Sequence, residues 1–274
     1  MYFAGIDIGS TMTKVAIMNE GLLASFIGPT GPEHRRLAHK VMESALAQAH
    51  IPFTEITYII ATGYGRINVP FADRQVTEIS CHAKGVSSLF PSARTVIDIG
   101  GQDCKAIRLL PNGRVKEFVM NDKCAAGTGR FLEVVAQKLG LKLEELGELS
   151  LQASAPVKIS STCTVFAEQE IISHLADGAS IGAIVAGIHQ SIAERIGNMV
   201  NRIRIERDVV ITGGGAKNTG LVKALEASLG CPVQVPPEPL LTGCIGAALL
   251  GKEYTLQAQQ RGQNLPIKER KLVS

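Results

Sequence analysis

The start of the chain alternates short apolar stretches with polar turns, and the pattern then changes to the spacing of a helix. Apolar stretches bounded by turn residues are typical of strands, whereas apolar residues three and four positions apart indicate a helix with one buried face. The order is three strands, a helix, a strand that enters a glycine-containing turn, and a second helix. We expect these elements at Tyr2–Ile6, Val15–Met18, a strand after the turn Asn19–Gly21, Glu33–Ala49, Tyr58–Ala61, Thr62–Gly65 and Glu78–Leu89.

The same pattern then begins again, because the stretch Gly5–Lys14 reappears as Val96–Lys105, 91 residues later. Each copy is an apolar strand, a carboxylate, a glycine turn and a second apolar strand, and in the second copy a third strand follows the turn Pro111–Gly113. We therefore expect a duplicated, two-lobed fold in which both halves share a three-strand meander followed by helices. The residues that fall in register are Asp7 and Asp98, Gly9 and Gly100, and Lys14 and Lys105.

Helical spacing dominates the second half of the chain. We expect helices at about 126–139, 142–149, 164–177, 180–204, 217–229 and 241–251, and strands at Asp208–Ile211 and Val233–Val235. No low-complexity linker separates the two copies, so any hinge lies between packed lobes. We predict an N-terminal lobe at 1–92 with the first of the two repeated glycine turns, a C-terminal lobe at 93–251 with the second, and a loose polar tail at 252–274.

Composition narrows the classes of function. The 274 residues are 45% apolar and 19% charged, which suits a globular protein with a sizeable core. The net charge of +3 is small and dispersed, aromatics make up 4% and Trp is absent, so we predict no nucleic-acid partner. We also predict no membrane partner and a cytoplasmic location, because no apolar stretch reaches spanning length and no signal-peptide layout opens the chain. The six cysteines are then thiols, metal ligands or catalytic groups.

The two repeated turns carry the residue types that hold a nucleotide polyphosphate. Glycines let backbone N–H groups converge on an anion, and carboxylates hold hydrated Mg²⁺ or orient the attacking water. One such turn is more often a plain hairpin, but two matched copies followed by the turn Thr212–Gly215, a flat surface for a purine and its ribose, favour nucleotide binding. We predict catalytic roles for Asp7, Asp98 and Asp103, and nucleotide binding by Gly9, Ser10, Thr11, Lys14, Gly100, Gly101, Gln102, Gly127, Thr128, Gly213, Gly214, Gly215 and Ala216.

This order of motifs resembles the superfamily of actin, sugar kinases and heat-shock chaperone ATPases, over nearly the whole chain to about Gly251. The resemblance implies an α/β, two-lobed actin-like ATPase fold with duplicated mixed sheets and an interlobe nucleotide cleft. It departs from some members because no large insertion separates the motifs to host a sugar or a folded client.

Two cysteines stand in segments that open predicted helices. Cys124 lies in Asn121–Phe131 and Cys163 in Ser160–Glu168, and both are flanked by small or helix-capping residues. We expect each thiol at a helix N-terminus, where the thiolate that binds metal is favoured. Two thiolates are too few for an iron–sulfur cluster, which usually takes four, but a two-fold dimer would supply the others. Spacing alone leaves open that both cysteines are buried and inert.

Longer stretches of the sequence resemble the ATP-dependent activators, or reductase components, of 2-hydroxyacyl-CoA dehydratases. This family is related to the ATPase subunits of benzoyl-CoA reductase and to the reductases of double-cubane cluster proteins. The stretches that carry the resemblance are Thr62–Arg66, Glu78–Ala83, Val96–Asp103, Asn121–Phe131 and Ser161–Glu168.

The resemblance implies a homodimer with one [4Fe-4S] cluster on its two-fold axis, ligated by Cys124 and Cys163 of both protomers. It also implies ATP, ADP and Mg²⁺ as cofactors and ferredoxin or flavodoxin as electron donor. ATP hydrolysis would drive a low-potential electron to an iron–sulfur dehydratase or reductase component.

Two alternatives stay open on the sequence. A small-molecule kinase of the same superfamily, such as an amino-sugar kinase, would share the phosphate loops, and so would a nucleotide-gated interaction module without redox chemistry. Neither gives a reason for the two cysteine segments. We interpret Cys104, Cys231 and Cys244 as structural, and the pair Cys81 and His82 has no assigned role.

Overall fold

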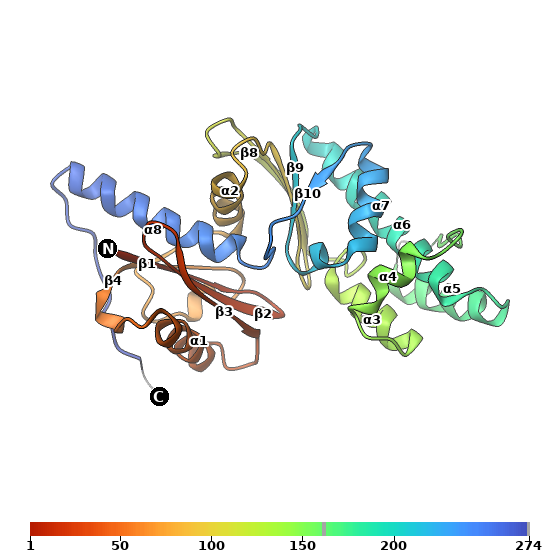
Figure 1. The fold of residues 1–274 in the computed structure, drawn as a ribbon, viewed down its shortest axis with the longest axis horizontal. Coiled ribbons are helices and arrows are strands. Elements are labelled where there is room, and N and C mark those ends of the chain that lie inside the picture. Colours follow the sequence, from red (N-terminus) through yellow and green to blue (C-terminus); the bar gives the residue numbers. More distant parts are fainter. Residues whose placement is uncertain (161–162, 273–274) are drawn as a thin grey trace. The chain divides into compact units, whose positions relative to one another are not determined.

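The computed structural model describes residues 1–160 and 163–272, and the chain folds into two compact units, each built on a five-stranded mixed sheet (Figure 1). Unit 1 contains Met1–Ala93, Leu109–Lys116 and Leu240–Ser274, and unit 2 contains Arg94–Arg108 and Glu117–Pro239. The predicted α/β fold with duplicated mixed sheets is confirmed. Of the predicted cysteine segments, Ser161 and Thr162 lie outside the described residues.

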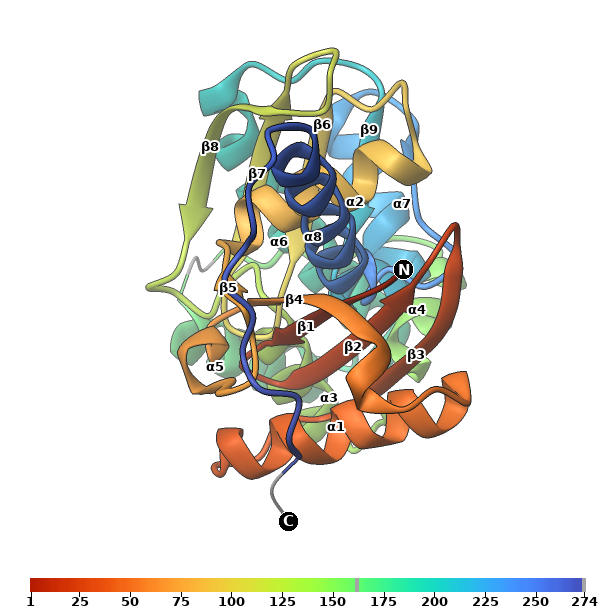
Figure 2. The same ribbon diagram turned by 90° about the vertical axis from the view of Figure 1, so that its left-hand side faces the viewer.

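Unit 1 covers one face of its sheet with α1 and the other with α8, beside which α2 packs (Figure 2). Successive side chains of a strand point to opposite faces, so β1 directs Ile6 and Ile8 toward α1 and Phe3 toward α8. The sheet order is β3-β2-β1-β4-β5, with β4 parallel to β1. The elements are β1 (Tyr2–Ile8), β2 (Met12–Met18), β3 (Leu22–Pro29), α1 (His34–Ala49), β4 (Ile56–Thr62), β5 (Arg74–Gln75), α2 (Glu78–Leu89) and α8 (Thr242–Gln260), with short 3₁₀ turns at Phe53–Glu55 and Arg66–Asn68.

Unit 2 has the sheet order β10-β9-β6-β7-β8, and its core lies between Ile97 and Ile99 of β6 and the helices α3, α6 and α7. The elements are β6 (Thr95–Ile99), β7 (Cys104–Leu109), β8 (Val115–Asn121), α3 (Gly129–Leu139), α4 (Glu145–Leu151), α5 (Thr164–Ala176), α6 (Ile181–Val200), β9 (Val209–Thr212), α7 (Thr219–Leu229) and β10 (Val233–Gln234), with 3₁₀ turns at Asn201–Ile203 and Gly214–Lys217. In the part of the chain that the structure describes, no helix combines the length and the hydropathy needed to cross a membrane.

The two sheets repeat one topology strand by strand. In each, the first strand pairs with the second in antiparallel fashion and with the fourth in parallel fashion. The repeat noticed in the sequence therefore extends beyond the two phosphate loops, because β4 and β5 of unit 1 correspond to β9 and β10 of unit 2.

The C-terminal segment differs from the sequence prediction. We expected a helix at 241–251 in the C-terminal lobe and a loose tail at 252–274, but α8 continues to Gln260 and belongs to unit 1. Glycines explain the placement: a Cβ on Gly5 of β1 would lie 1.9 Å from the Cys244 carbonyl oxygen, so the helix backbone rests directly on the strand. Beyond the helix, Arg270 forms a salt bridge with Asp73 at 2.6 Å, which ties the last residues to the same unit.

Candidate functional site

The first of the two loops predicted to bind phosphate, the first phosphate loop, joins β1 to β2 in unit 1. Asp7 is 4% exposed, and its Oδ2 accepts a hydrogen bond from Lys14 Nζ at 2.8 Å. The two side chains meet because the residues are cross-strand partners. Beyond them the Gly9 N–H donates to the Met12 carbonyl at 3.1 Å and closes the turn. The residues of the turn that stay at least partly exposed, and so accessible to a phosphate, are Gly9, Ser10 and Thr11.

The second phosphate loop repeats this arrangement in unit 2 and adds a carboxylate. Lys105 Nζ donates to Asp103 Oδ1 at 2.7 Å and to Asp98 Oδ2 at 3.3 Å, and the Gly100 N–H donates to the Asp103 carbonyl at 2.9 Å. Asp98 and Lys105 are each 4% exposed, whereas the Asp103 side chain is 32% exposed. The accessible backbone of this loop belongs to Gly100, Gly101 and Gln102.

The charges of the two loops are not equal. Unit 1 pairs one carboxylate with one ammonium group, whereas unit 2 places Asp98 and Asp103 around the single ammonium of Lys105. Mg²⁺ binds through one or two carboxylates together with phosphate oxygens and waters. The excess negative charge and the partly exposed Asp103 oxygens therefore fit Mg²⁺ in the second loop better than in the first.

The turn after β9, predicted to seat adenosine, is joined to the second phosphate loop by contacts within unit 2. Thr212 Oγ1 donates to Asp98 Oδ1 at 3.0 Å. Gly213 has a φ of 80°, and a Cβ there would lie 2.4 Å from the Ile99 carbonyl oxygen, so only glycine fits. Gly214 is exposed, while Gly215 and Ala216 are buried. The exposed backbone available to a nucleoside is thus concentrated at Gly214.

Gly127 and Thr128 lie beside the second phosphate loop. The two residues that follow them, Gly129 and Arg130, donate their N–H groups to the carbonyls of Gly100 and Gly101, both at 2.8 Å. Thr128 is 1% exposed, and its Oγ1 donates to the Ala125 carbonyl at 2.6 Å. Its hydroxyl thus holds the loop before α3.

One residue and one turn at these loops, Lys105 and Thr62–Gly65, were not among the site residues predicted from the sequence. Lys105 stands in register with Lys14, which the repeat already revealed. The turn Thr62–Gly65 is the unit 1 counterpart of Thr212–Gly215: Gly63 has a φ of 84°, and a Cβ there would lie 2.3 Å from Asp7 Oδ1. The shared pattern Thr-Gly-x-Gly after a buried strand was the signal in the sequence.

Only two of the six cysteines are accessible: Cys163 is exposed and Cys124 is partly exposed. Cys163 is the N-cap residue of α5, as predicted. Cys124 differs from the prediction, since α3 begins at Gly129 with Thr128 as its N-cap. The helix cannot start earlier because Gly127 adopts a φ of 89°, which lies outside helical geometry. The Cys124 loop is instead held by Asn121, whose Nδ2 donates to the Cys124 carbonyl at 2.9 Å.

The other four cysteines are buried. Burial raises the pKa of the Cys81 thiol to about 12 and also raises the pKa of Cys104 and Cys244, so these three thiols stay protonated near neutral pH. The exposed surface beside Cys163 is apolar, with Val165 62% and Phe166 64% exposed. Among the described residues, no group of three or more His, Cys, Asp or Glu side chains converges as a metal site.

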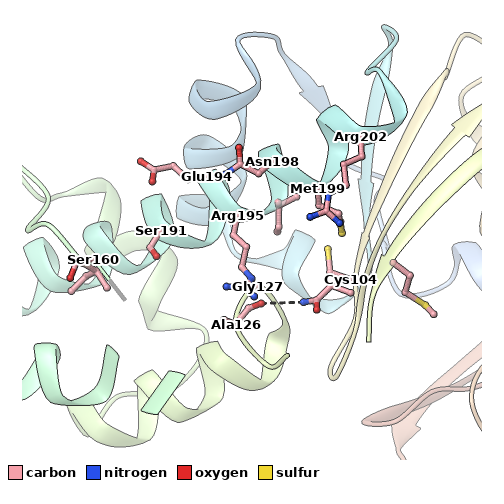
Figure 3. A pocket seen from close by; sticks show the side chains of 14 residues that line it. Cys104, Ala126, Gly127, Ser160, Ser191, Glu194, Arg195, Asn198, Met199 and Arg202 are labelled. Carbon is pink, nitrogen blue, oxygen red and sulfur yellow. Dashed lines mark hydrogen bonds between the residues drawn. The ribbon is translucent and has the colours of Figure 1, made fainter. Parts of the chain in front are cut away.

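A cavity of about 340 Å³ lies within unit 2, between α6, the end of β8 and the Cys124 loop (Figure 3). Arg195 of α6 extends toward Ala126 and Gly127, and Asn121 Nδ2 donates to the Ala126 carbonyl at 3.3 Å. Of the predicted nucleotide residues, only Gly127 lines it. The cavity therefore lies beside the Cys124 loop and is lined by few of the residues predicted to bind the nucleotide.

Two matched sheets, each with a phosphate-type turn after its first strand, define an actin-like ATPase or kinase fold. The solved structure of a ROK family glucokinase from Streptomyces griseus is similar to this chain in fold but not in sequence. Its TM-score is 0.57 and its identity 13%, over 92% of this chain and 100% of that one. The chain belongs to the BadF/BadG/BcrA/BcrD ATPase family, which it matches over residues 4–251.

Relatives within the family are much more similar. The 2-hydroxyisocaproyl-CoA dehydratase activator of Clostridioides difficile is 45% identical over 97% of this chain and 100% of its own length. The activator of lactoyl-CoA dehydratase of Anaerotignum propionicum is 48% identical over 95% and 100%. The solved structure of the activator of the 2-hydroxyisocaproyl-CoA dehydratase from Clostridium difficile, with bound ADPNP, has a TM-score of 0.89 and 44% identity and covers 97% of this chain and 100% of that one.

Proposed function

We propose that this chain is an ATPase that activates an iron–sulfur partner enzyme by one-electron reduction, with a [4Fe-4S] cluster shared between two copies of the chain. The observation that carries the proposal is the division of the cysteines. Cys124 and Cys163 are accessible, and the other four are buried. A sugar kinase of the same fold would have no use for this division.

The ATPase part rests on the two phosphate loops and on family membership. Ser10, Thr11 and the backbone of Gly100 to Gln102 would bind phosphate oxygens, and Gly214 would contact the nucleoside. Asp98 and Asp103 would hold Mg²⁺ and orient the attacking water, a role that phosphoryl transfer requires because positioning and charge stabilisation supply most of its catalysis.

The cysteines supply a suitable donor set for the cluster. Each chain offers two accessible thiols, and a two-fold dimer therefore offers the four thiolates that a cubane cluster takes. Exposed Val165 and Phe166 beside Cys163 form an apolar surface that a second copy would cover. When bound, the cluster would supply a carrier that accepts and releases one electron. The N-terminus of α5, where Cys163 is the N-cap, favours the negative charge of its thiolate.

The partner is proposed from the relatives. Both curated relatives described above are activators of 2-hydroxyacyl-CoA dehydratases, so we propose an iron–sulfur dehydratase of this class as the electron acceptor. One electron would enter from reduced ferredoxin or flavodoxin and one would leave to the dehydratase, while ATP and water give ADP and phosphate.

The test is anaerobic purification followed by iron, sulfide and molar-mass measurement. We expect a dimer with about two iron and two sulfide per chain, since one cluster is shared. Cys124→Ala and Cys163→Ala should each give colourless protein that still binds ATP. Cys231→Ala, at a buried cysteine, is the matched control and should keep the colour.

Two results would contradict the proposal. A monomer without inorganic sulfide would remove the redox part and leave a phosphate-handling enzyme, which an assay with small alcohols as phosphate acceptors would then identify as a kinase. A brown double variant that lacks both Cys124 and Cys163 and still transfers electrons would refute the ligand assignment.

A further inference from the structure

His82, whose role the sequence left open, lies inside unit 1 beside the carboxylate of the first phosphate loop. It is 6% exposed, and its Nδ1 is 2.9 Å from Thr242 Oγ1 in the first turn of α8. The neighbouring Gly243 lies between the two groups. A Cβ on this glycine would be 3.0 Å from Asp7 Oδ2 and 3.3 Å from His82 Nε2, so both atoms border the same small space.

The backbones around this space are packed without intervening side chains. A Cβ on Gly246 would lie 1.8 Å from the Cys81 carbonyl oxygen, and one on Gly85 would lie 2.0 Å from the Thr242 carbonyl oxygen. These two glycines let α2 and α8 cross closely (Figure 2). The crossing fixes His82 relative to α8 and therefore relative to Asp7.

The duplicated fold shows that Asp7 has fewer hydrogen-bond donors than its counterpart Asp98. In unit 2, Asp98 receives hydrogen bonds from Lys105 on one oxygen and from the Thr212 hydroxyl on the other. In unit 1, Asp7 receives the equivalent lysine bond from Lys14. Thr62 is the counterpart of Thr212. Within the described residues its buried hydroxyl has no hydrogen-bond partner, so it does not donate to Asp7. The repeat is thus broken at Asp7 Oδ1. His82 borders the other oxygen, Oδ2, to which Lys14 donates, so it could supply this carboxylate with a second donor from a different side.

We infer that His82 is a positioning residue of the first phosphate loop: its imidazole, anchored by Thr242, presents Nε2 toward Asp7 across Gly243 and holds the carboxylate in the orientation that ATP hydrolysis needs. The inference rests on the proposed ATPase function. When the Thr242 hydroxyl donates to Nδ1, the neutral imidazole carries its proton on Nε2, which then acts as the donor. Carboxylates at metal and phosphate sites are commonly oriented by such a second group, and loss of the orientation costs rate more than binding.

Steady-state ATP hydrolysis and ATP affinity of purified full-length variants test this role. His82→Ala should lower kcat by about 10- to 100-fold, the range for a misplaced group at a reacting centre, while the Kd for ATP changes less than about threefold. His82→Gln can place an amide N–H near the position of Nε2, and His82→Asn can place one only near Nδ1. We expect the glutamine variant to recover at least half of the lost activation free energy and the asparagine variant to resemble alanine.

Separate variants test the hydrogen bond of Thr242 to His82 and the space that Gly243 leaves between His82 and Asp7. Thr242→Ser keeps the hydroxyl and should keep kcat, whereas Thr242→Val removes it at similar volume and should lower kcat in the same direction as His82→Ala. Gly243→Ala inserts a methyl group between the two side chains and should lower kcat without removing either. His39→Ala is the control and should leave both constants unchanged, because His39 lies on α1 and packs edge-on against Phe71.

The outcomes separate the two proposals. Wild-type protein that hydrolyses no ATP would refute the proposed function itself. Active wild type with an unchanged kcat in folded His82→Ala would overturn the inference alone. A loss of ATP binding and of thermal stability equal in the alanine and glutamine variants would also overturn it, because a packing role predicts no rescue by an Nε2-like donor.

Discussion

Replacing Arg270 by alanine should destabilise unit 1, although this residue lies only four positions from the end of the chain. Its side chain is 8% exposed, and the carboxylate of its partner Asp73 is fully buried. The guanidinium donates to both Asp73 oxygens, at 3.0 and 2.6 Å. It also donates to four backbone carbonyls, those of Ile56, Thr57, Phe71 and Lys268.

The magnitude follows from what the substitution leaves behind. Removing one partner of a buried ion pair leaves an uncompensated charge and typically costs about 3–5 kcal/mol. Asp73 keeps two backbone donors, the N–H groups of Ile59 at 2.7 Å and Lys268 at 2.6 Å. These bonds offset part of the penalty, so we expect a loss near the lower end, about 3 kcal/mol.

Urea denaturation followed by circular dichroism measures this loss, since the chain has no Trp for fluorescence. If the two units unfold in separate transitions, only that of unit 1 should shift. Lys271→Ala is the control, because that side chain is 71% exposed. A double-mutant cycle with Asp73→Asn should show a coupling of at least about 1.5 kcal/mol, because the second change removes the charge that the first leaves unpaired.

A loss below about 1 kcal/mol for Arg270→Ala with an unchanged denaturant slope would refute this reasoning, since it would mean that the buried pair contributes no more than an exposed one. Additive single losses in the cycle would do the same.

Three further predictions follow from groups buried elsewhere. Lys105→Ala should lower the unfolding free energy by about 3 kcal/mol or more, and by more than Lys14→Ala does, because it removes the ion-pair partner of two carboxylates instead of one. Equal losses of unfolding free energy in the two variants, measured without nucleotide, would contradict this. Iodoacetamide at pH 8 should label two cysteines of folded cluster-free protein, Cys124 and Cys163, because the others are buried and the pKa of Cys81 is raised to about 12; mass spectrometry would expose a rapid third label. Burial lowers the pKa of His189 from 6.5 to about 4, so the unfolded chain binds a proton that the folded chain excludes. Unit 2 should therefore lose about 3 kcal/mol as the pH falls from 6.5 to 4, and His189→Gln should lack this component; parallel pH profiles of the two proteins would rule it out.

The local part of the fold could be predicted from the sequence because its signals are local. The repeat of Gly5–Lys14 as Val96–Lys105 indicated two hairpins, and the structure pairs Asp7 with Lys14 and Asp98 with Lys105 as cross-strand partners. Cross-strand pairing after a tight turn is determined by the turn and the alternation of apolar residues, both of which are visible in the chain.

Long-range placement could not be predicted in the same way. The small residues of α8 permit close packing, but nothing in their spacing says whether the partner is β1, about 240 residues away in the sequence, or a neighbour in the second half. The start of α3 was misjudged because Gly127 can adopt either sign of φ, and only the surrounding loop selects the positive one. The contact of His82 with Thr242 depends on the same helix crossing.

Because unit 1 is assembled from both ends of the chain, its folding has an order in time. During synthesis the strands β1 to β4 leave the ribosome long before α8 exists to cover Phe3, Tyr58 and Ile60. Unit 2, whose residues are almost continuous, can close its own core first. Until α8 has been synthesised, a nascent chain therefore carries a finished second unit and an open apolar sheet, which is the stage at which chaperones would be needed most.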